Sequence, residues 1–267
     1  MTAPSAAPVT EQRPAGIPPR WLRSEVVLVF ALSLGADGLR ALVRLIGDAT
    51  SGQALTAQTA VLNGSQAPGR PLLDLTYQLV SLATGVVPVF LVWHFLIRSG
   101  ERMSTIGVDL TRPKTDVARG AVIAAIIGGS GLGLYLAAHA LGVDLTVVAE
   151  SLPVVWWRIP VLLLSALQNA TLEEVLVAGY LLHRLRQLGW GDNRALLLSA
   201  TVRGSYHLYQ GLGGFFGNAV MGLIFGRLYQ RWGRVMPLLI AHTLMDAVAF
   251  VGYAELAGHV SWLPIPG

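Results

Sequence analysis

The stretch QNATLEEVLVAGYLLHRLR, residues 168–186, places two adjacent carboxylates, Glu173 and Glu174, inside an otherwise apolar run. The run begins near Val154 and continues to about Leu185, which is long enough for a helix that spans a bilayer. A charged side chain at the centre of such a helix costs about 2.5–3.5 kcal/mol or more. Because hydrophobicity gives no reason to keep either carboxylate, we expect both to have a function.

The composition places the whole chain in a membrane. Of its 267 residues, 53% are hydrophobic and 13% are charged, and the mean hydropathy is +0.57. Soluble domains carry roughly 25% charged residues, so this chain has too few charges to cover a soluble core. Cysteine is absent, which excludes disulfides, thiolate metal sites and Cys nucleophiles. The arginines lie at the ends of apolar runs rather than along one polar face, so nucleic-acid binding is not expected despite the net charge of +4.

The apolar runs predict an all-α, polytopic bundle of about seven transmembrane helices. They cover about residues 25–46, 71–97, 117–141, 154–185, 194–209, 215–229 and 235–253. The fifth and sixth runs are short against the ~20 residues that a spanning helix needs, so we expect tilt or a re-entrant turn around Gly211, Gly213 and Gly214. The count rises to eight if residues 143–157 also enter the membrane.

One domain is expected, because the sequence contains no internal repeat. Residues 1–20 are rich in Pro, Ala and polar residues, which predicts a disordered segment rather than a signal peptide. Residues 21–258 are expected to form the transmembrane domain, with the motifs described below in residues 155–250, and residues 259–267 a C-terminal tail. Arg and Lys concentrate before the first run and after the second, fourth and sixth runs, which predicts a cytoplasmic N-terminus.

Polar pairs spaced by one helical turn interrupt three of the apolar runs, so each pair shares one helix face. They are Asn169 with Glu173, Arg203 with His207, and His242 with Asp246. Carboxylates and imidazoles from three apolar helices suit the activation of a water molecule, with a carboxylate as general base. Two His and a carboxylate could alternatively hold a metal. On the assumed helix ends, Glu173 and His242 lie nearer the cytoplasmic side and His207 nearer the outer side.

The order and spacing of these residues resemble the CAAX-protease and bacteriocin-processing (CPBP) family of intramembrane endopeptidases. The family motifs are E-E-x-x-x-R, then F-x-x-x-H, then H-x-x-x-N or a variant. This chain has matching residues over about residues 155–250: Glu173, Glu174, His207, His242 and Asp246, with Gly179 after the first motif. The resemblance implies a membrane-embedded endopeptidase, in a bacterial plasma membrane, that hydrolyses a peptide bond of a membrane-associated protein or peptide.

The resemblance also implies a role for each residue. Glu173 would be the general base on water and Glu174 would support it. His207 would position the water, and His242 with Asp246 would stabilise the oxyanion. In the metalloprotease description of the family, His207, His242 and Glu173 would hold a divalent metal such as zinc, and both descriptions stay open. The expected partners are the lipid bilayer and a substrate that is a prenylated protein, a peptide precursor or a regulatory membrane protein.

Two departures from the family pattern stand out: Ala178 occupies the Arg position and Arg203 the Phe position. Our hypothesis is that Arg203 supplies the guanidinium that the first motif lacks, which adds Arg203 to the catalytic set. Asp246 in place of Asn is a milder change, since both carry a side-chain oxygen, although ionised Asp cannot donate a hydrogen bond.

Other functions remain open at this point. A catalytically inactive family member would act as a membrane scaffold or immunity-type protein, which Ala178 favours. A proton-coupled transporter also uses buried Glu and His, but the sequence has no repeated halves. Each site residue has a purely structural interpretation as a packing or hydrogen-bonding contact. His94, His139, His183 and His259 lie near helix ends, where we expect interfacial positions only.

Overall fold

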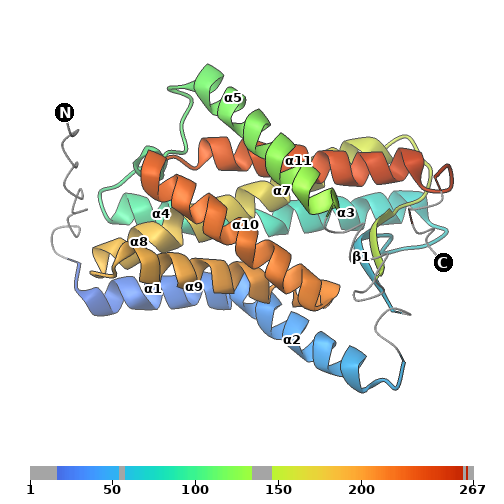
Figure 1. Ribbon diagram of the computed structural model, residues 1–267, viewed down its shortest axis with the longest axis horizontal. Coiled ribbons are helices and arrows are strands. Elements are labelled where there is room, and N and C mark those ends of the chain that lie inside the picture. The colour runs from blue at the N-terminus through green and yellow to red at the C-terminus, as the bar shows by residue number, and fades with distance from the viewer. Residues whose placement is uncertain (1–16, 54–57, 134–145, 261–262, 264–267) are drawn as a thin grey trace.

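The computed structural model describes residues 17–53, 58–133, 146–260 and residue 263. It is an elongated bundle of helices that lie side by side, with a small sheet at one end (Figure 1). The expectation of a helical membrane bundle is therefore confirmed. The sheet is an exception to the all-α prediction: β1 (Thr59–Gly64) pairs in parallel with β2 (Thr146–Ser151).

The helices follow one another along the chain with short breaks. In order they are α1 (Pro19–Ala31), α2 (Leu34–Thr50), α3 (Pro71–Gly85), α4 (Val87–Arg98), η2 (Met103–Ile106), α5 (Pro113–Ile123), η3 (Ala124–Gly128), α7 (Arg158–Glu173), η4 (Glu174–Leu181), α8 (Leu182–Gln187), α9 (Asp192–Ser205), η5 (Leu208–Gln210), α10 (Gly211–Trp232) and α11 (Met236–Leu256).

Five helical segments are long and apolar enough to cross a membrane. They are Pro71–Arg98, Pro113–Gly133, Arg158–Gln187, Leu208–Trp232 and Met236–Leu256. The pair α1 and α2, bent by 49°, brings the number to six among the described residues. The predicted count of seven or eight is not confirmed. The fifth apolar run forms α9, whose 14 residues give a length of about 21 Å, short of the ~30 Å hydrocarbon core.

Other boundaries also differ from the sequence expectations. Helix α1 begins at Pro19, inside the segment expected to be disordered, while residues 1–16 lie outside the described residues. The last part of the third apolar run, residues 134–141, lies outside them too. Residues 146–151, within the stretch considered as an eighth span, form β2 instead of a helix. Most of the expected C-terminal tail is likewise not described.

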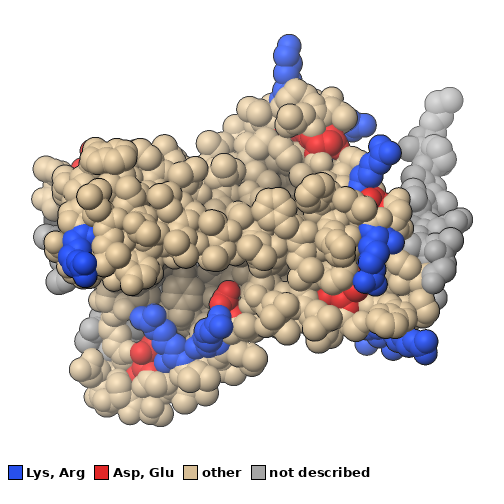
Figure 2. Space-filling model, turned by 180° about the vertical axis from the view of Figure 1, so that it is seen from behind, with Lys and Arg blue, Asp and Glu red and all other residues tan. Residues whose placement is uncertain are grey.

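The segment Arg158–Gln187 is the central element of the bundle. In its apolar window 61% of the residues are buried, against 17–33% in the other four segments. The others expose large apolar side chains on their outer faces, as helices in contact with lipid do. Figure 2 shows a broad uncharged surface with Lys and Arg gathered mainly toward its margins. Helices α11 and α3 pack against α7, and α9 and α10 against the π-helical stretch η4.

The central helix changes its hydrogen-bonding pattern directly after Glu173. Residues Glu174–Leu181 are π-helical and all eight are buried. Short π-helical stretches are frequent at functional sites. Gly179 permits this stretch to pack closely, because a Cβ there would lie 2.8 Å from Val235 Cγ2. Ser199 of α9 donates a hydrogen bond to the Val177 carbonyl at 3.0 Å, which ties α9 to the same stretch.

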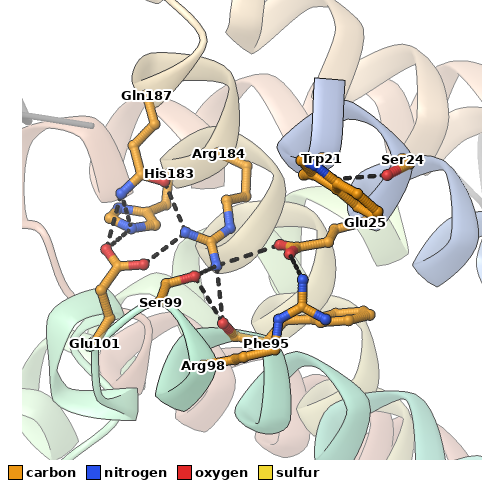
Figure 3. A network of polar contacts seen from close by, with 10 residues as sticks. All are labelled: Trp21, Ser24, Glu25, Phe95, Arg98, Ser99, Glu101, His183, Arg184 and Gln187. Carbon is orange, nitrogen blue, oxygen red and sulfur yellow. Dashed lines mark hydrogen bonds and ion pairs between the residues drawn. The ribbon is translucent and has the colours of Figure 1, made fainter. Parts of the chain in front are cut away.

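A buried ion-pair network joins α8 to α1 and to the end of α4 (Figure 3). The fully buried Arg184 donates to Glu101 Oε2 at 2.6 Å and to Ser99 Oγ at 2.8 Å. Arg184 also lies 3.7 Å from Glu25 Oε2, and the other oxygen of Glu25 accepts from Arg98 at 3.1 Å.

His183 belongs to the same network, so the expectation that it lies at the interface is wrong. Its ring is 2% exposed, and its Nε2 lies 2.6 Å from Glu101 Oε1. Burial raises the pKa of the Glu101 carboxyl, but the hydrogen bond with His183 and the charge of Arg184 lower it more, so the pKa lies below its ordinary value. Glu101 is therefore an ionised partner that holds α8 in place.

Replacing Arg184 with Leu is expected to destabilise the protein by about 3–5 kcal/mol, because Glu25 and Glu101 would lose their buried cation. Thermal unfolding of the purified protein in detergent measures the loss. Arg40→Leu is the matched control: Arg40 pairs with Asp37, their side chains are 77% and 49% exposed, and such surface pairs contribute about 0–1 kcal/mol. Equal unfolding temperatures for the two variants would contradict a structural role for the network.

Candidate active site

The two glutamates lie where α7 ends and the π-helical stretch begins. Glu173 is the last residue of α7 and Glu174 the first residue of η4. The side chain of Glu174 is fully buried and that of Glu173 is 10% exposed. Because both carboxylates lie inside an apolar bundle, each requires hydrogen-bond or charged partners from neighbouring helices.

Arg203 of α9 is the cation that both glutamates share. Its Nη2 donates to Glu174 Oε1 at 2.6 Å and lies 3.3 Å from Glu173 Oε2. The guanidinium also lies over the Phe225 ring of α10, 5.2 Å from its centroid. The side chain is 1% exposed, so its positive charge interacts with these carboxylates and not with solvent. Arg203 thus stands where the sequence hypothesis requires a guanidinium.

His242 of α11 lies between two carboxylates. Its Nδ1 is 2.8 Å from Glu174 Oε1, and its Nε2 is 3.6 Å from Asp246 Oδ1, one turn further along the same helix. The ring is 5% exposed and packs edge-on against Phe225. The imidazole is therefore fixed in orientation, with Nδ1 directed to the buried glutamate and Nε2 to Asp246.

His207 reaches the glutamates because α9 is short. The helix ends at Ser205 and the chain turns into η5, so His207 lies at the turn between them. Its Nε2 is 3.7 Å from Glu173 Oε2. The amide of Gln210 lies 3.2 Å from Nδ1. When this amide donates to Nδ1, the neutral ring carries its proton on Nε2, the nitrogen that faces Glu173.

Tyr206 is a residue of the cluster that the sequence interpretation missed. Its hydroxyl donates to Glu173 Oε2 at 2.8 Å. A signal was present, because Tyr206 follows Arg203 by three residues and shares its helix face. An aromatic residue in an apolar run is more simply interpreted as a packing residue, so its hydroxyl gave no reason to single it out.

The cluster divides into a buried layer and an accessible layer. Arg203, Glu174 and His242 have side chains that are 0–5% exposed. Glu173 at 10%, His207 at 13% and Asp246 at 22% form the accessible layer. Tyr206, Arg203 and His207 all approach Oε2 of Glu173. No described residue donates to its other oxygen, Oε1, which is therefore the oxygen available to a water molecule or a substrate.

The structure brings together all six residues that the sequence singled out as catalytic: Glu173, Glu174, Arg203, His207, His242 and Asp246. They come from α7, η4, α9, the turn after α9, and α11. Asn169, which shares a helix face with Glu173, lines a separate cavity. Ala178 is buried in the main apolar core. The positions predicted to act together thus lie within one cluster, and roles for each of them follow as a proposal below.

The side chains in this arrangement do not fit a metal ion. Among the residues that the structure describes, no group of three His, Asp or Glu side chains is placed to hold one. In particular, His207, His242 and Glu173 do not form a ligand set. His242 Nδ1 is engaged by Glu174, and Arg203 already brings a positive charge against both glutamates.

Comparison with known proteins gives one family match. Residues 155–248 match the family described as "Type II CAAX prenyl endopeptidase Rce1-like". No curated protein and no solved structure matches the chain. The matched segment contains both glutamates, Arg203, both site histidines and Asp246. The expected relationship to the CAAX-protease family is thereby confirmed, and the apolar helices and this family together identify an integral membrane protein. Residues 155–248 of this chain are thus similar to the Rce1-like family of type II CAAX prenyl endopeptidases.

Proposed function

We propose that the protein is an intramembrane endopeptidase in which Glu173 activates the water that attacks a peptide bond. The observation that carries the proposal is the state of the Glu173 carboxylate. One oxygen is held by Tyr206 and Arg203, and the other meets no donor among the described residues. A carboxylate held in this way presents one fixed, accessible oxygen, as a general base requires.

In the proposed reaction, Glu173 Oε1 accepts a proton from water as the water oxygen bonds to the substrate carbonyl carbon. The carbonyl oxygen becomes an oxyanion, which the Nε2–H of His207 stabilises together with the Nε2–H of a protonated His242, whose Nδ1–H donates to Glu174. Asp246 keeps the His242 ring oriented. The proton then passes from Glu173 to the leaving nitrogen as the C–N bond breaks. No covalent enzyme intermediate is formed, and the sequence contains no cysteine nucleophile.

In the buried layer, Glu174 and Arg203 affect the reaction through the residues that they hold in place. Glu174 and Glu173 share the charge of Arg203, so the guanidinium counteracts repulsion between two adjacent carboxylates. Glu174 also fixes the Nδ1 side of His242. In this proposal Glu174 and Arg203 are positioning residues, while Glu173, His207 and His242 meet the reacting atoms.

The proposed substrate is a prenylated CAAX peptide, the class in the matched family's description. A peptide with a farnesylated Cys followed by three residues, labelled at its amino end, is offered to the purified protein in proteoliposomes. Mass spectrometry is expected to detect the loss of the last three residues, with Glu173→Gln as the inactive control. A non-prenylated peptide of the same sequence tests whether the lipid is needed. Absence of cleavage of either peptide would contradict this substrate class.

Other membrane substrates are tested in cells. Membranes from cells that make the wild type or Glu173→Ala are compared by mass spectrometry for full-length proteins that accumulate only in the variant. Identical membrane proteomes, together with intact test peptides, would contradict proteolysis altogether. In that case the alternative of an inactive scaffold would gain support. Ala178 no longer favours that alternative by itself, because Arg203 provides a guanidinium to both glutamates.

Removal of metal ions is expected to leave the cleavage rate unchanged. The reason is that His207, His242 and Glu173 are not arranged as a ligand set, and Arg203 supplies the positive charge at the carboxylates. The measurement compares cleavage before and after treatment with 1,10-phenanthroline, with the non-chelating 1,7-phenanthroline as control. Loss of activity with the chelator alone, restored by added zinc, would contradict the proposed metal-free mechanism.

A further inference from the structure

A second polar cavity lies beside the central helix, apart from the cluster of ionisable residues. It has a volume of about 230 Å³. Amide and hydroxyl side chains from three elements line it: Asn63 of β1, Gln78 and Ser81 of α3, and Ser165, Gln168 and Asn169 of α7. No Asp, Glu, Lys, Arg or His among the described residues is part of its lining. The cavity therefore suits a ligand that forms hydrogen bonds and carries no charge.

The polar side chains that α7 contributes to this cavity form no side-chain hydrogen bonds with other described residues. Ser165 is 8% exposed, yet none of Ser165, Gln168 and Asn169 has a side-chain hydrogen bond to a described residue. Gln168 and Asn169 are half-buried, so the polar groups of this wall can form hydrogen bonds with a ligand that enters the cavity. The opposite wall is satisfied, since Asn63 donates to the Ala149 carbonyl at 3.0 Å and Gln78 to the Gly64 carbonyl at 3.0 Å. The cavity thus has one fixed wall and one with free hydrogen-bonding groups.

Ser165 and Asn169 lie on α7 before Glu173, the proposed general base. Asn169 precedes Glu173 by one helical turn and Ser165 by two, which are rises of about 6 Å and 12 Å along the axis. Both residues share the helix face of Glu173. Glu173 lies further along this face, at the carboxyl end of α7.

A neighbouring crevice lies between the cavity and the break between α1 and α2. The crevice has a volume of about 350 Å³, and its walls include Ser33 at the break and Leu172 next to Glu173. The two hollows share Ser81. Gly85 lies between them, where a Cβ would be 2.7 Å from Gln168 Nε2. The Gln168 side chain therefore packs closely against Gly85, at the place where the two hollows approach each other.

We propose that this cavity binds the main chain of an extended peptide segment next to the scissile bond. Main-chain amides combine donors and acceptors without charge, which is what Ser165, Gln168 and Asn169 can pair with. Strand β1 supports an extended ligand, because its residues Leu62 to Gly64 line the cavity and β2 is its only partner strand in the described parts of the chain. The inference rests on the proposed peptidase function and adds the place where the substrate backbone lies.

The absence of cysteine from the chain permits a direct test. Ser165→Cys and Asn169→Cys each give a protein with a single thiol in the cavity. Reaction with N-ethylmaleimide in detergent is timed with and without the farnesylated CAAX peptide, in the Glu173→Gln background to prevent turnover. With the peptide at about nine times its Kd, occupancy of about 90% is expected to slow the labelling about tenfold.

Two single-cysteine variants outside the cavity are controls, because peptide is not expected to change their labelling. Ser104→Cys lies outside the membrane segments on an exposed turn and is expected to react at the same rate with and without peptide. Leu163→Cys lies on the outer face of α7, where the native side chain is 46% exposed, and its labelling is expected to be unaffected by peptide. Absence of labelling at both cavity positions, or labelling without protection, would overturn the proposal.

The failure of this proposal and that of the peptidase function give different results. Wild-type cleavage of the peptide with unprotected cavity thiols would overturn the cavity as the backbone site and leave the peptidase function intact. Protected cavity thiols in a protein that cuts no peptide would support the cavity and contradict hydrolysis.

Discussion

Glu173→Gln is expected to lower the rate of peptide hydrolysis by about 10²–10⁴-fold, the usual contribution of a general base. The amide is nearly the same size as the carboxylate but does not accept a proton from water. Its carbonyl oxygen can still accept the hydrogen bond that Tyr206 donates to Oε2 at 2.8 Å. The variant should therefore fold and bind substrate while the chemical step fails.

Glu174→Gln is the matched control for this substitution. It makes the same chemical change at the neighbouring position, but Glu174 is fully buried and pairs with Arg203 and His242. We expect the Glu174 variant to lose thermal stability as well as activity, because two buried partners lose their anion. Rates and unfolding temperatures of both variants are measured on the same preparations. A Glu173→Gln enzyme with wild-type turnover would remove Glu173 from the mechanism.

The sequence predicted which residues of the site lie together, but it did not predict where along each helix they meet. The spacing of four residues placed His242 and Asp246 on one face of α11, and the structure has them 3.6 Å apart. The depth of each residue in the membrane was not available from that pattern. His207 was expected nearer the outer side because its run was treated as a span, whereas α9 ends at Ser205 and turns His207 back toward Glu173.

Contacts between residues that are far apart in the chain could not be predicted from the sequence pattern. Arg184 at the end of an apolar run reads as a positive charge of a cytoplasmic loop, yet it is fully buried against Glu25 and Glu101. Strands β1 and β2 are six residues each and far apart in the chain, so neither run alone indicates a sheet. Local sequence specifies helical faces well, but it does not specify which loops and ends fold back into the bundle.

The break in the first apolar run had a local cause that composition alone conceals. Residues 25–46 were expected to form one helix, and the structure has α1 and α2 bent by 49°. The Ser33 hydroxyl at the break donates to the Val29 carbonyl. Ser side chains that bond to the carbonyl four residues earlier often bend helices. A hydropathy value averaged over a window of residues changes little with a single Ser, so it does not reveal the bend.

Arg203→Ala is expected to abolish peptide cleavage and to destabilise the fold by about 3–5 kcal/mol, the cost of leaving a buried charge without its partner. The substitution leaves Glu173 and the fully buried Glu174 adjacent to each other with no guanidinium. It also removes the contact with the Phe225 ring. Arg203→Lys keeps the charge but not the planar group that meets both carboxylates, so a partial loss is expected.

The second substitution Ala178→Arg distinguishes a missing charge from a general defect. Ala178 follows Glu174 by four residues on the buried π-helical stretch, in the position where the family motif has Arg. In the Arg203→Ala protein the space left by Arg203 can receive the new side chain, whereas in the wild-type protein Ala178→Arg adds volume to a packed core. We therefore expect the double variant to recover part of both the cleavage rate and the unfolding temperature, and Ala178→Arg alone to lower stability. If Arg203→Ala cleaves at the wild-type rate, or if the double variant recovers neither quantity, then Arg203 does not substitute for the family's arginine.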